Sequence, residues 1–230
     1  MLELRTAEYF CLTIGNATRG LEMPLVFRHF RRMAESQSFR MMYVRPRVLL
    51  LSTLLCVALA PLLCAQQSAL DLDGNRVNPL TSNAGRVVVL IFVRQDCPIS
   101  GRYAPAIQRI SDQHQKDARF YLVFPDKSGS PSDIRKYLSD FHYSISGLRD
   151  PDHALVKQAH AQVTPEAAVF DARGALVYHG RIDNLYESFG HARSAPTTHE
   201  LQDALEDALA GRAPANKDVA AVGCYISDLQ

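Results

Sequence analysis

The stretch that decides the fold is "LIFVRQDCPISGRYAP", residues 90–105, where an apolar run ends at a cysteine and a helical pattern begins. The run "GRVVVLIFVRQD" is rich in Val and Ile, which predicts a buried central strand. The segment "APAIQRISDQHQ" has apolar residues at helical spacing. Cys97 therefore stands at a strand-to-helix junction, where free backbone N–H groups and the helix dipole stabilise a thiolate. The alternative is a small, inert apolar side chain.

The segments that follow carry helix and strand signals in alternation. "ARFYLVFPD" predicts a second buried strand, and "SPSDIRKYLSDF" predicts a helix with Ser130 as its N-cap and Pro131 in its first turn. "DPDHALVKQAHAQ" repeats this pattern, so a helix capped by Asp150 is expected. "TPEAAVFDARGALVYHGRID" predicts an antiparallel hairpin that turns at Gly174.

The last helical segment, "TTHELQDALEDALAG", is expected to be capped by Thr197 or Thr198 and to stop at Gly211. Together these elements predict an α/β fold with a mixed central sheet. A parallel βαβ unit is extended by the antiparallel hairpin, and helices cover both faces.

Length and composition favour a single globular domain. The chain has 230 residues, of which 47% are hydrophobic and 21% are charged. Eight of its 25 basic and four of its 24 acidic residues lie in residues 1–47, so the rest holds 17 basic and 20 acidic residues. A slightly acidic body gives no electrostatic footprint for nucleic acid, and no nucleic-acid partner is expected.

The N-terminal part has the layout of an export signal. Residues 48–63 form an uncharged apolar run that follows two arginines and precedes "CAQQSALD". We expect residues 41–65 to be a signal peptide cut after Ala65 or a membrane anchor, and the protein to be periplasmic or otherwise extracytoplasmic. Because 40 residues do not fit in front of such a signal, residues 1–40 are interpreted as a non-native extension, with the natural start at Met41 or Met42. The remaining expected units are a domain over residues 66–211 and a tail over residues 212–230.

Export leaves a small set of cysteines. The chain has five, and the body after the predicted signal keeps Cys97 and Cys224. An oxidising compartment favours pairing of an even set. The long separation is no obstacle, since the cost of loop closure grows only logarithmically with length. A disulfide between Cys97 and Cys224 is therefore a hypothesis, and the alternative is that Cys224 is buried in an apolar contact of the tail.

The motif "VVVLIFVRQDCPISGRYAP" resembles the strand, active-site turn and first helix of the thioredoxin-like superfamily. The resemblance places Cys97 on the nucleophilic cysteine of C-x-x-C, Ser100 on the second cysteine and Pro105 on the proline inside the first helix. "VTPEAAVFD" is similar to the cis-proline loop, so Thr164 and Pro165 are expected to flank a cis peptide bond beside the cysteine and the substrate peptide.

Several segments, "TPEAAVFD", "YHGRIDN" and "AVGCYI", resemble more narrowly the redoxin-type exported proteins of bacteria that are grouped with alkyl hydroperoxide reductase and thiol-specific antioxidant (AhpC/TSA). The sequence departs from the relatives at defined positions. Ile91 stands where thioredoxins have a buried acid, and Leu90 and Arg94 stand where peroxiredoxins have Pro and Thr. Val93 stands where a copper-delivering relative would need a second cysteine.

The resemblance implies an exported thiol-disulfide oxidoreductase with Cys97 as nucleophile and Cys224 or an external thiol as the resolving group. A divergent thiol peroxidase and a redox-inactive binding module remain alternatives. The expected partners are thiols and disulfides of proteins or small molecules. If the protein is a thiol peroxidase, peroxides are also expected, and if residues 48–63 are a retained anchor, they tether the protein to a membrane. No cofactor is expected. No metal is expected either, because the histidines lack ligand spacing; they are residues 153, 160, 179, 191 and 199.

Overall fold

The computed structural model describes residues 68–83 and 85–227. The predictions for the export signal, the N-terminal extension and the membrane tether concern residues outside this described part. Within it, none of the helices is long and apolar enough to cross a membrane.

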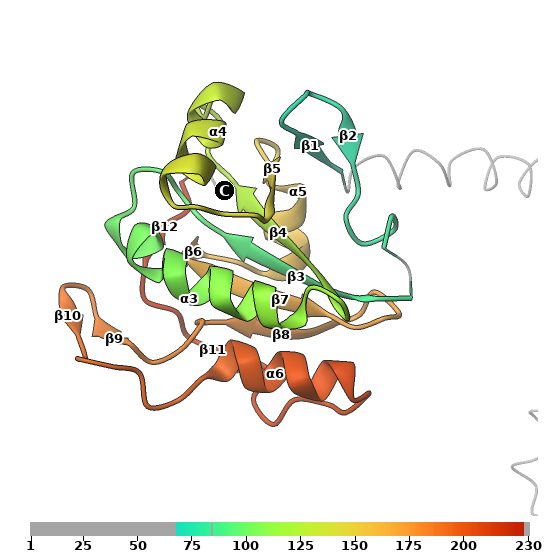
Figure 1. The fold of residues 1–230 in the computed structure, drawn as a ribbon, viewed down its shortest axis with the longest axis vertical. Helices are drawn as coiled ribbons and strands as arrows, with labels where there is room; N and C mark the ends of the chain where they lie inside the picture. Colours follow the sequence, from blue (N-terminus) through green and yellow to red (C-terminus); the bar gives the residue numbers. More distant parts are fainter. Residues whose placement is uncertain (1–67, 84, 228–230) are drawn as a thin grey trace, which may run out of the picture. The chain divides into compact units, whose positions relative to one another are not determined.

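A central sheet organises the described residues, with strand order β11-β8-β7-β3-β4-β5-β1-β2 (Figure 1). Its strands are β1 (Ala69–Asp71), β2 (Arg76–Val77), β3 (Val87–Phe92), β4 (Ala118–Phe124), β5 (Ser146–Arg149), β7 (Glu166–Phe170), β8 (Leu176–Gly180) and β11 (Asp218–Val219). Strand β3 runs parallel to β4 and antiparallel to β7, and β4 runs parallel to β5. The prediction of a mixed sheet is confirmed.

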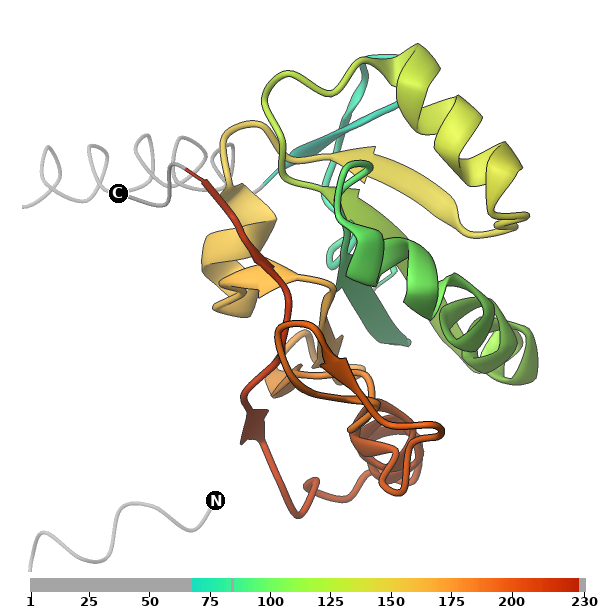
Figure 2. The same cartoon turned by 90° about the vertical axis from the view of Figure 1, so that its left-hand side faces the viewer.

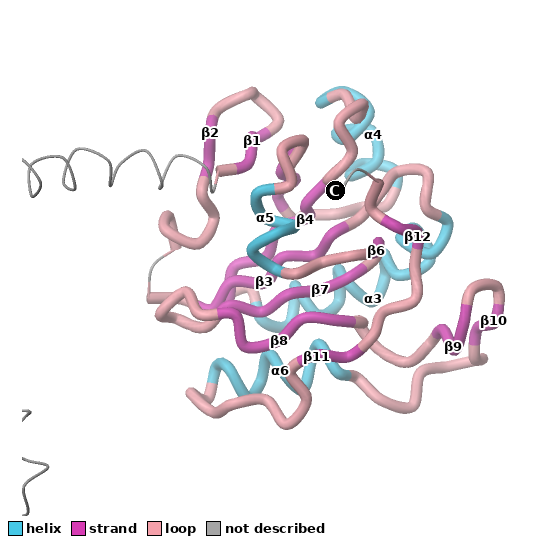
Figure 3. The backbone as a smooth tube through the Cα atoms, turned by 180° about the vertical axis from the view of Figure 1, so that it is seen from behind, coloured by secondary structure: helices cyan, strands magenta, loops and turns pink. Residues whose placement is uncertain are grey.

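Helices cover both faces of this sheet. They are α3 (Pro98–His114), α4 (Pro131–Asp140), α5 (Ala154–Ala159) and α6 (Glu200–Leu209). All six residues of β3 are buried, with Val89 and Ile91 in a cluster with α3, α4 and α6, and Leu90 and Phe92 in a second cluster with α5. Figure 3, seen from behind, shows α5 on its own face of the sheet. Because both faces are covered, the strand is continuously apolar rather than alternating.

The start of α4 follows its sequence signals. Ser130 is the N-cap, its hydroxyl accepts the backbone N–H of Asp133 at 3.1 Å, and Pro131 opens the helix. The hairpin prediction is also confirmed, since β7 and β8 pair antiparallel and Gly174 turns between them at a φ of +81°.

Two predicted caps are wrong. Helix α5 begins after His153, not after Asp150. The buried Asp150 carboxylate nevertheless accepts the N–H groups of Ala154, Leu155 and Val156 at 2.8–2.9 Å, so it satisfies the start of the helix from further upstream.

Helix α6 begins after His199, which caps it without a side-chain hydrogen bond. The two threonines expected there bond elsewhere. Thr198 donates to the Glu200 carboxylate at 2.6 Å, and the Thr197 hydroxyl accepts from the Asn184 amide at 2.7 Å. The predicted stop at Gly211 agrees with the end of the helix at Leu209 and with a φ of +69° at this glycine.

Several short strands carry no sequence prediction. They are β1, β2, β5, β6 (Val163–Thr164), β9 (Tyr186–Ser188), β10 (His191–Ala192), β11 and β12 (Cys224–Tyr225). Each has at most four residues, too few to show a period. Figure 2 shows the C-terminal segment, in red, running back along the domain from β11. This return brings β12 against β6, far away in sequence.

Candidate functional site

Cys97 lies at the junction that the sequence predicts. It follows the end of β3 and is the N-cap residue of α3, with Pro98 as the first helical residue. Its backbone carbonyl accepts the N–H of Gly101 at 3.3 Å, and its side chain is 2% exposed. The sulfur is therefore held at the positive end of a 17-residue helix, away from bulk water.

Two groups from distant parts of the chain contact the Cys97 sulfur. The Cys224 sulfur lies 2.6 Å away across 127 positions of sequence, and the Thr164 carbonyl oxygen lies 3.1 Å away. Both cysteines are present as thiols. The protonated Cys97 thiol donates to the carbonyl, and the Cys224 thiol donates to Cys97. The Thr164–Pro165 peptide bond is cis, and both Thr164 and the adjacent Pro165 are buried.

The pairing of β12 with β6 brings Cys224 to this position. The two strands are antiparallel, and Cys224 is in register with Thr164. The Ile226 N–H donates to the Gln162 carbonyl at 2.9 Å, and the Thr164 hydroxyl donates to the Cys224 carbonyl at 3.4 Å. The C-terminal segment is thus an added strand on the loop that precedes the cis proline.

The two thiols have opposite pKa shifts. Burial raises the pKa of Cys97, but hydrogen bonds from the Cys224 thiol and from the backbone N–H and hydroxyl of Ser100 lower the pKa by more. Burial, the hydrogen bond to Cys97 and the charge on its sulfur raise the pKa of Cys224 to about 11. The negative charge therefore belongs on Cys97, and Cys224 keeps its proton.

Ser100, where the resemblance puts a second cysteine, is fully buried in the first turn of α3. Its hydroxyl accepts the backbone N–H of Arg94 at 3.4 Å and stabilises the Cys97 thiolate. The sequence thus keeps a polar donor at this position but places the second sulfur on β12.

Arg94 has a structural role that the sequence does not reveal. Its guanidinium forms an ion pair with Asp96 at 2.8 Å and donates to the Tyr225 carbonyl at 3.2 Å. This second bond ties the loop before Cys97 to the C-terminal strand, and its positive charge lowers the pKa of Cys224. Arg102, the other arginine near the motif, is exposed.

Glu166 is a second residue that sequence reasoning misses. Its carboxylate is 6% exposed and accepts the N–H groups of Gln162 and Val163 at 2.8 Å and 3.1 Å. These bonds fix the backbone of β6 just before the cis peptide. A charged residue inside the apolar run "TPEAAVF" is the signal that could have identified it.

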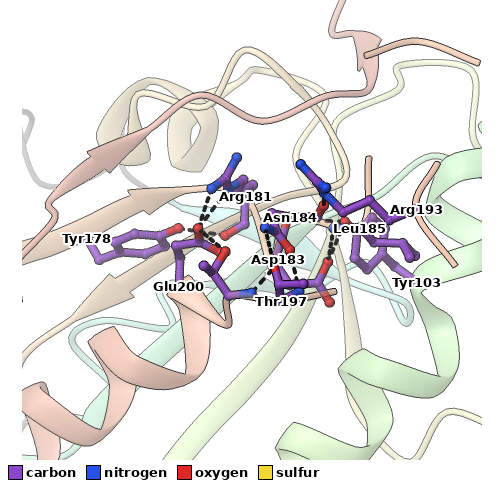
Figure 4. Close-up of polar contacts among 10 residues, drawn as sticks. Tyr103, Tyr178, Arg181, Asp183, Asn184, Leu185, Arg193, Thr197 and Glu200 are labelled. Carbon is purple, nitrogen blue, oxygen red and sulfur yellow. Dashed lines mark hydrogen bonds and ion pairs between the residues drawn. The ribbon is translucent and has the colours of Figure 1, made fainter. Parts of the chain in front are cut away.

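The long loop after β8 forms a polar network of its own (Figure 4). The Tyr103 hydroxyl, on α3, donates to the Asp183 carboxylate at 2.8 Å, and Arg181 forms an ion pair with Glu200. Arg193 pairs with Glu187 at 2.8 Å. The two loop arginines are thus in ordinary ion pairs, and the contacts of Tyr103 and Arg181 anchor the loop to α3 and α6.

The histidines give no metal centre in the described part of the chain. No group of three or more His, Cys, Asp or Glu side chains there could hold a metal ion. His153 is buried and contacts the Pro125 carbonyl through Nε2 at 3.0 Å, so its role is structural.

Solved structures of other proteins are similar to this fold. No family model and no curated protein matches the chain. An uncharacterised conserved protein from Geobacillus kaustophilus is 23% identical over 69% of this chain and 86% of its own, with a TM-score of 0.60. A hypothetical protein from Sinorhizobium meliloti 1021 is 17% identical over 69% and 88%, with a TM-score of 0.59.

The described part of the chain has the order β3-α3-β4, a cysteine as the N-cap residue of α3 and a cis proline before the β7–β8 hairpin. The fold is thioredoxin-like. A secreted disulfide oxidoreductase from Mycobacterium tuberculosis also aligns, at 18% identity over 64% of this chain and 97% of its own, with a TM-score of 0.44. At 23% and 17% identity, the likeness to the Geobacillus and Sinorhizobium structures extends to the fold and not to an activity.

Chemically, the site pairs a stabilised thiolate with a protonated thiol in contact. Such a pair suits nucleophilic attack on a sulfur followed by closure of an internal disulfide.

Proposed function

We propose that the protein is a thiol-disulfide oxidoreductase in which Cys97 is the nucleophile and Cys224 the resolving thiol. The observation that carries this proposal is the 2.6 Å contact between the two sulfurs, with the pKa of Cys97 lowered and that of Cys224 raised to about 11. A thiolate attacks disulfides far better than a thiol does, so the order of attack follows from these opposite shifts.

The reaction takes two exchange steps. The Cys97 thiolate attacks one sulfur of a substrate disulfide, a mixed disulfide forms, and the other substrate sulfur leaves as a thiolate that takes up a proton. The Cys224 thiol then loses its proton and attacks the Cys97 sulfur. A Cys97–Cys224 disulfide forms, and the second substrate thiol leaves. Two electrons pass to the substrate, and a thiol reductant restores the pair.

The contact between the two sulfurs also explains why Cys224 reacts second. The pKa of Cys224 is raised by burial and also by the hydrogen bond and charge of Cys97. Both of the latter influences end when Cys97 enters a mixed disulfide, because its sulfur is then neutral. Cys224 therefore becomes easier to ionise at the moment it has to attack. Ser100 stabilises the attacking thiolate, and Thr164 and Pro165 supply the backbone against which the sulfurs meet.

The experiment compares Cys97→Ser and Cys224→Ser, each made in a full chain whose Cys11, Cys56 and Cys64 are replaced by serine, in reduced form on a small disulfide that releases a chromophoric thiol. Cys97→Ser is expected to abolish release. Cys224→Ser is expected to release one equivalent and to stop as a mixed disulfide, visible by intact mass, whereas the wild type proceeds to the internal disulfide. Release that survives Cys97→Ser contradicts the proposal, and Cys97-dependent consumption of hydrogen peroxide without disulfide exchange favours a thiol peroxidase.

We further propose that this chemistry takes place outside the cytoplasm, as in the exported redoxin-type AhpC/TSA proteins that the sequence resembles. The support is the apolar run at residues 48–63 and the two cysteines left after it. N-terminal sequencing of the protein from a fractionated cell tests this. A mature end near Ala65 in the extracytoplasmic fraction supports a cleaved signal, an uncut membrane-bound chain supports an anchor, and a cytoplasmic chain contradicts export.

A further inference from the structure

We infer that the edge of β6 is the binding site for an extended partner peptide with the pattern Gly-Cys-X-aliphatic, and that the chain's own segment Gly223–Ile226 occupies this site as an internal copy of it. This inference rests on the proposed function and adds the substrate class. Its basis is the way in which each position of the C-terminal segment meets β6 and the cysteine.

The edge itself selects for an extended chain. Main-chain pairing with β12 and the Ile226-to-Gln162 hydrogen bond, at 2.9 Å, are backbone contacts that any strand in the same register can make. That register puts a cysteine opposite Thr164 and therefore against the Cys97 sulfur. A partner strand that takes the same register delivers its own cysteine to the same point.

The position before the cysteine accepts glycine alone. A Cβ on Gly223 would lie 2.3 Å from the Thr164 carbonyl oxygen and 2.7 Å from its carbon. These are backbone atoms, and the peptide bond that follows is the Thr164–Pro165 bond beside the nucleophile. Because the obstacle cannot rotate away as a side chain would, any larger residue pushes the strand off the edge.

The two positions after the cysteine differ in whether the site contacts their side chains. Tyr225 is 80% exposed, so its side chain is not selected, while its carbonyl accepts from Arg94 at 3.2 Å. Ile226 is 6% exposed and lies in the apolar cluster with Leu90 and Phe92. The site thus takes an apolar side chain two residues after the cysteine, and burial of a side chain of this kind is favourable.

The partner strand and β12 take the edge in turn. With β12 displaced, the Cys97 thiolate attacks the partner cysteine of a disulfide, and the other sulfur of that disulfide leaves as a thiolate that is protonated. When β12 returns, the Cys224 thiolate attacks Cys97, the internal disulfide forms, and the partner cysteine leaves as a thiol. The β12 strand is therefore both the resolving group and a competitor for the partner.

The test uses reduced full-length protein in which Cys11, Cys56 and Cys64 are replaced by serine, and three disulfides that release the same chromophoric thiol. Two are on peptides, Ac-Ala-Gly-Cys-Tyr-Ile-amide and Ac-Ala-Val-Cys-Tyr-Ile-amide, and one is on a small thiol that needs no strand pairing. The ratio of peptide rate to small-disulfide rate isolates recognition from thiol reactivity. We expect this ratio to be at least about tenfold higher for the glycine peptide, the factor that corresponds to one lost main-chain contact.

The protein variants test whether β12 uses the same edge. Gly223→Ala forces β12 away from β6 and is expected to raise the ratio for the glycine peptide severalfold. The matched control is Gly129→Ala, where an added Cβ lies at least 3.5 Å from its neighbours, and its ratio is expected to equal that of the wild type.

The outcomes separate the two proposals. Equal ratios for the two peptides, or an unchanged ratio in Gly223→Ala, overturn this inference while Cys97-dependent release from the small disulfide upholds the oxidoreductase. Absence of release from all three disulfides overturns the proposed function and this inference with it.

Discussion

A disulfide bond between Cys97 and Cys224 is expected to raise the free energy of unfolding strongly. Comparison of the oxidised with the reduced protein measures this effect without a mutation. The perturbation is oxidation of the two thiols, which lie 2.6 Å apart and 127 positions apart in sequence. A bond between them closes a long loop in the unfolded chain and removes much of its conformational entropy. For a loop of this length the entropy model gives about 5 kcal/mol of added unfolding free energy.

This free energy corresponds to a shift in melting temperature of about 10–20 °C, because each kcal/mol moves the midpoint of a domain of this size by about 2–4 °C. The assay is urea and thermal unfolding of oxidised and reduced wild type, followed by circular dichroism, since the chain has no Trp. Intact mass after alkylation verifies the redox state of each sample.

Cys224→Ser is the control, because it keeps the other four cysteines and so accounts for any cross-link that they form. Its midpoint is expected to be nearly the same with and without reductant. The reasoning is refuted if the verified wild-type disulfide leaves the midpoint unchanged, or if the two thiols do not pair under an oxidant that oxidises small dithiols.

Three further results are expected. With less than one equivalent of alkylating reagent, Cys97 should be labelled first, at a pH below the ordinary thiol range where its lowered pKa leaves thiolate, because the charge on Cys97 keeps Cys224 protonated. Labelling of Cys224 before Cys97 would contradict the opposite pKa shifts. Ser100→Ala should raise the pKa of Cys97 and slow exchange at neutral pH but not at high pH, as a pH–rate profile would show. Asp150→Asn replaces the carboxylate that accepts three helix N–H groups by an amide, so it should lower the free energy of unfolding by about 1–3 kcal/mol, as measured by urea unfolding. The control Asp152→Asn, at an exposed site, should leave this free energy unchanged.

The pH dependence of stability has a definite sign. The lowered pKa of Cys97 stabilises the reduced fold above the ordinary thiol pKa, and this contribution is lost as pH falls through the folded pKa. The raised pKa of Cys224 acts oppositely, because its contribution is present below the ordinary thiol pKa and is lost as pH rises toward 11. Undocking of β12 from β6 is therefore expected at strongly alkaline pH, where both sulfurs carry charge.

The predictable parts of the fold are those with strong local signals. The long apolar runs of β3 and β4, the capped start of α4 and the turn at Gly174 are specified by residues within a few positions of one another. The sequence predicts the wrong start for α5 because the Asp150 carboxylate accepts helix N–H groups from outside the helix, and spacing alone does not distinguish this from an N-cap. Short strands such as β5, β6 and β12 have too few residues to carry a period.

The candidate site divides in the same way. Sequence by itself determined that Cys97 stands between a strand and a helix, that Ser100 removes the local partner and that Cys224 is the other cysteine of the body. Only the tertiary structure decided that β12 pairs with β6, that Gly223 fits against Thr164 and that Arg94 and Glu166 fix the strands on either side. The physical reason is that a nucleophile's environment at a helix start is local. The contact between the Cys97 and Cys224 sulfurs, 127 positions apart, depends on backbone hydrogen bonds between β12 and β6, which the pattern of side chains in the sequence does not predict.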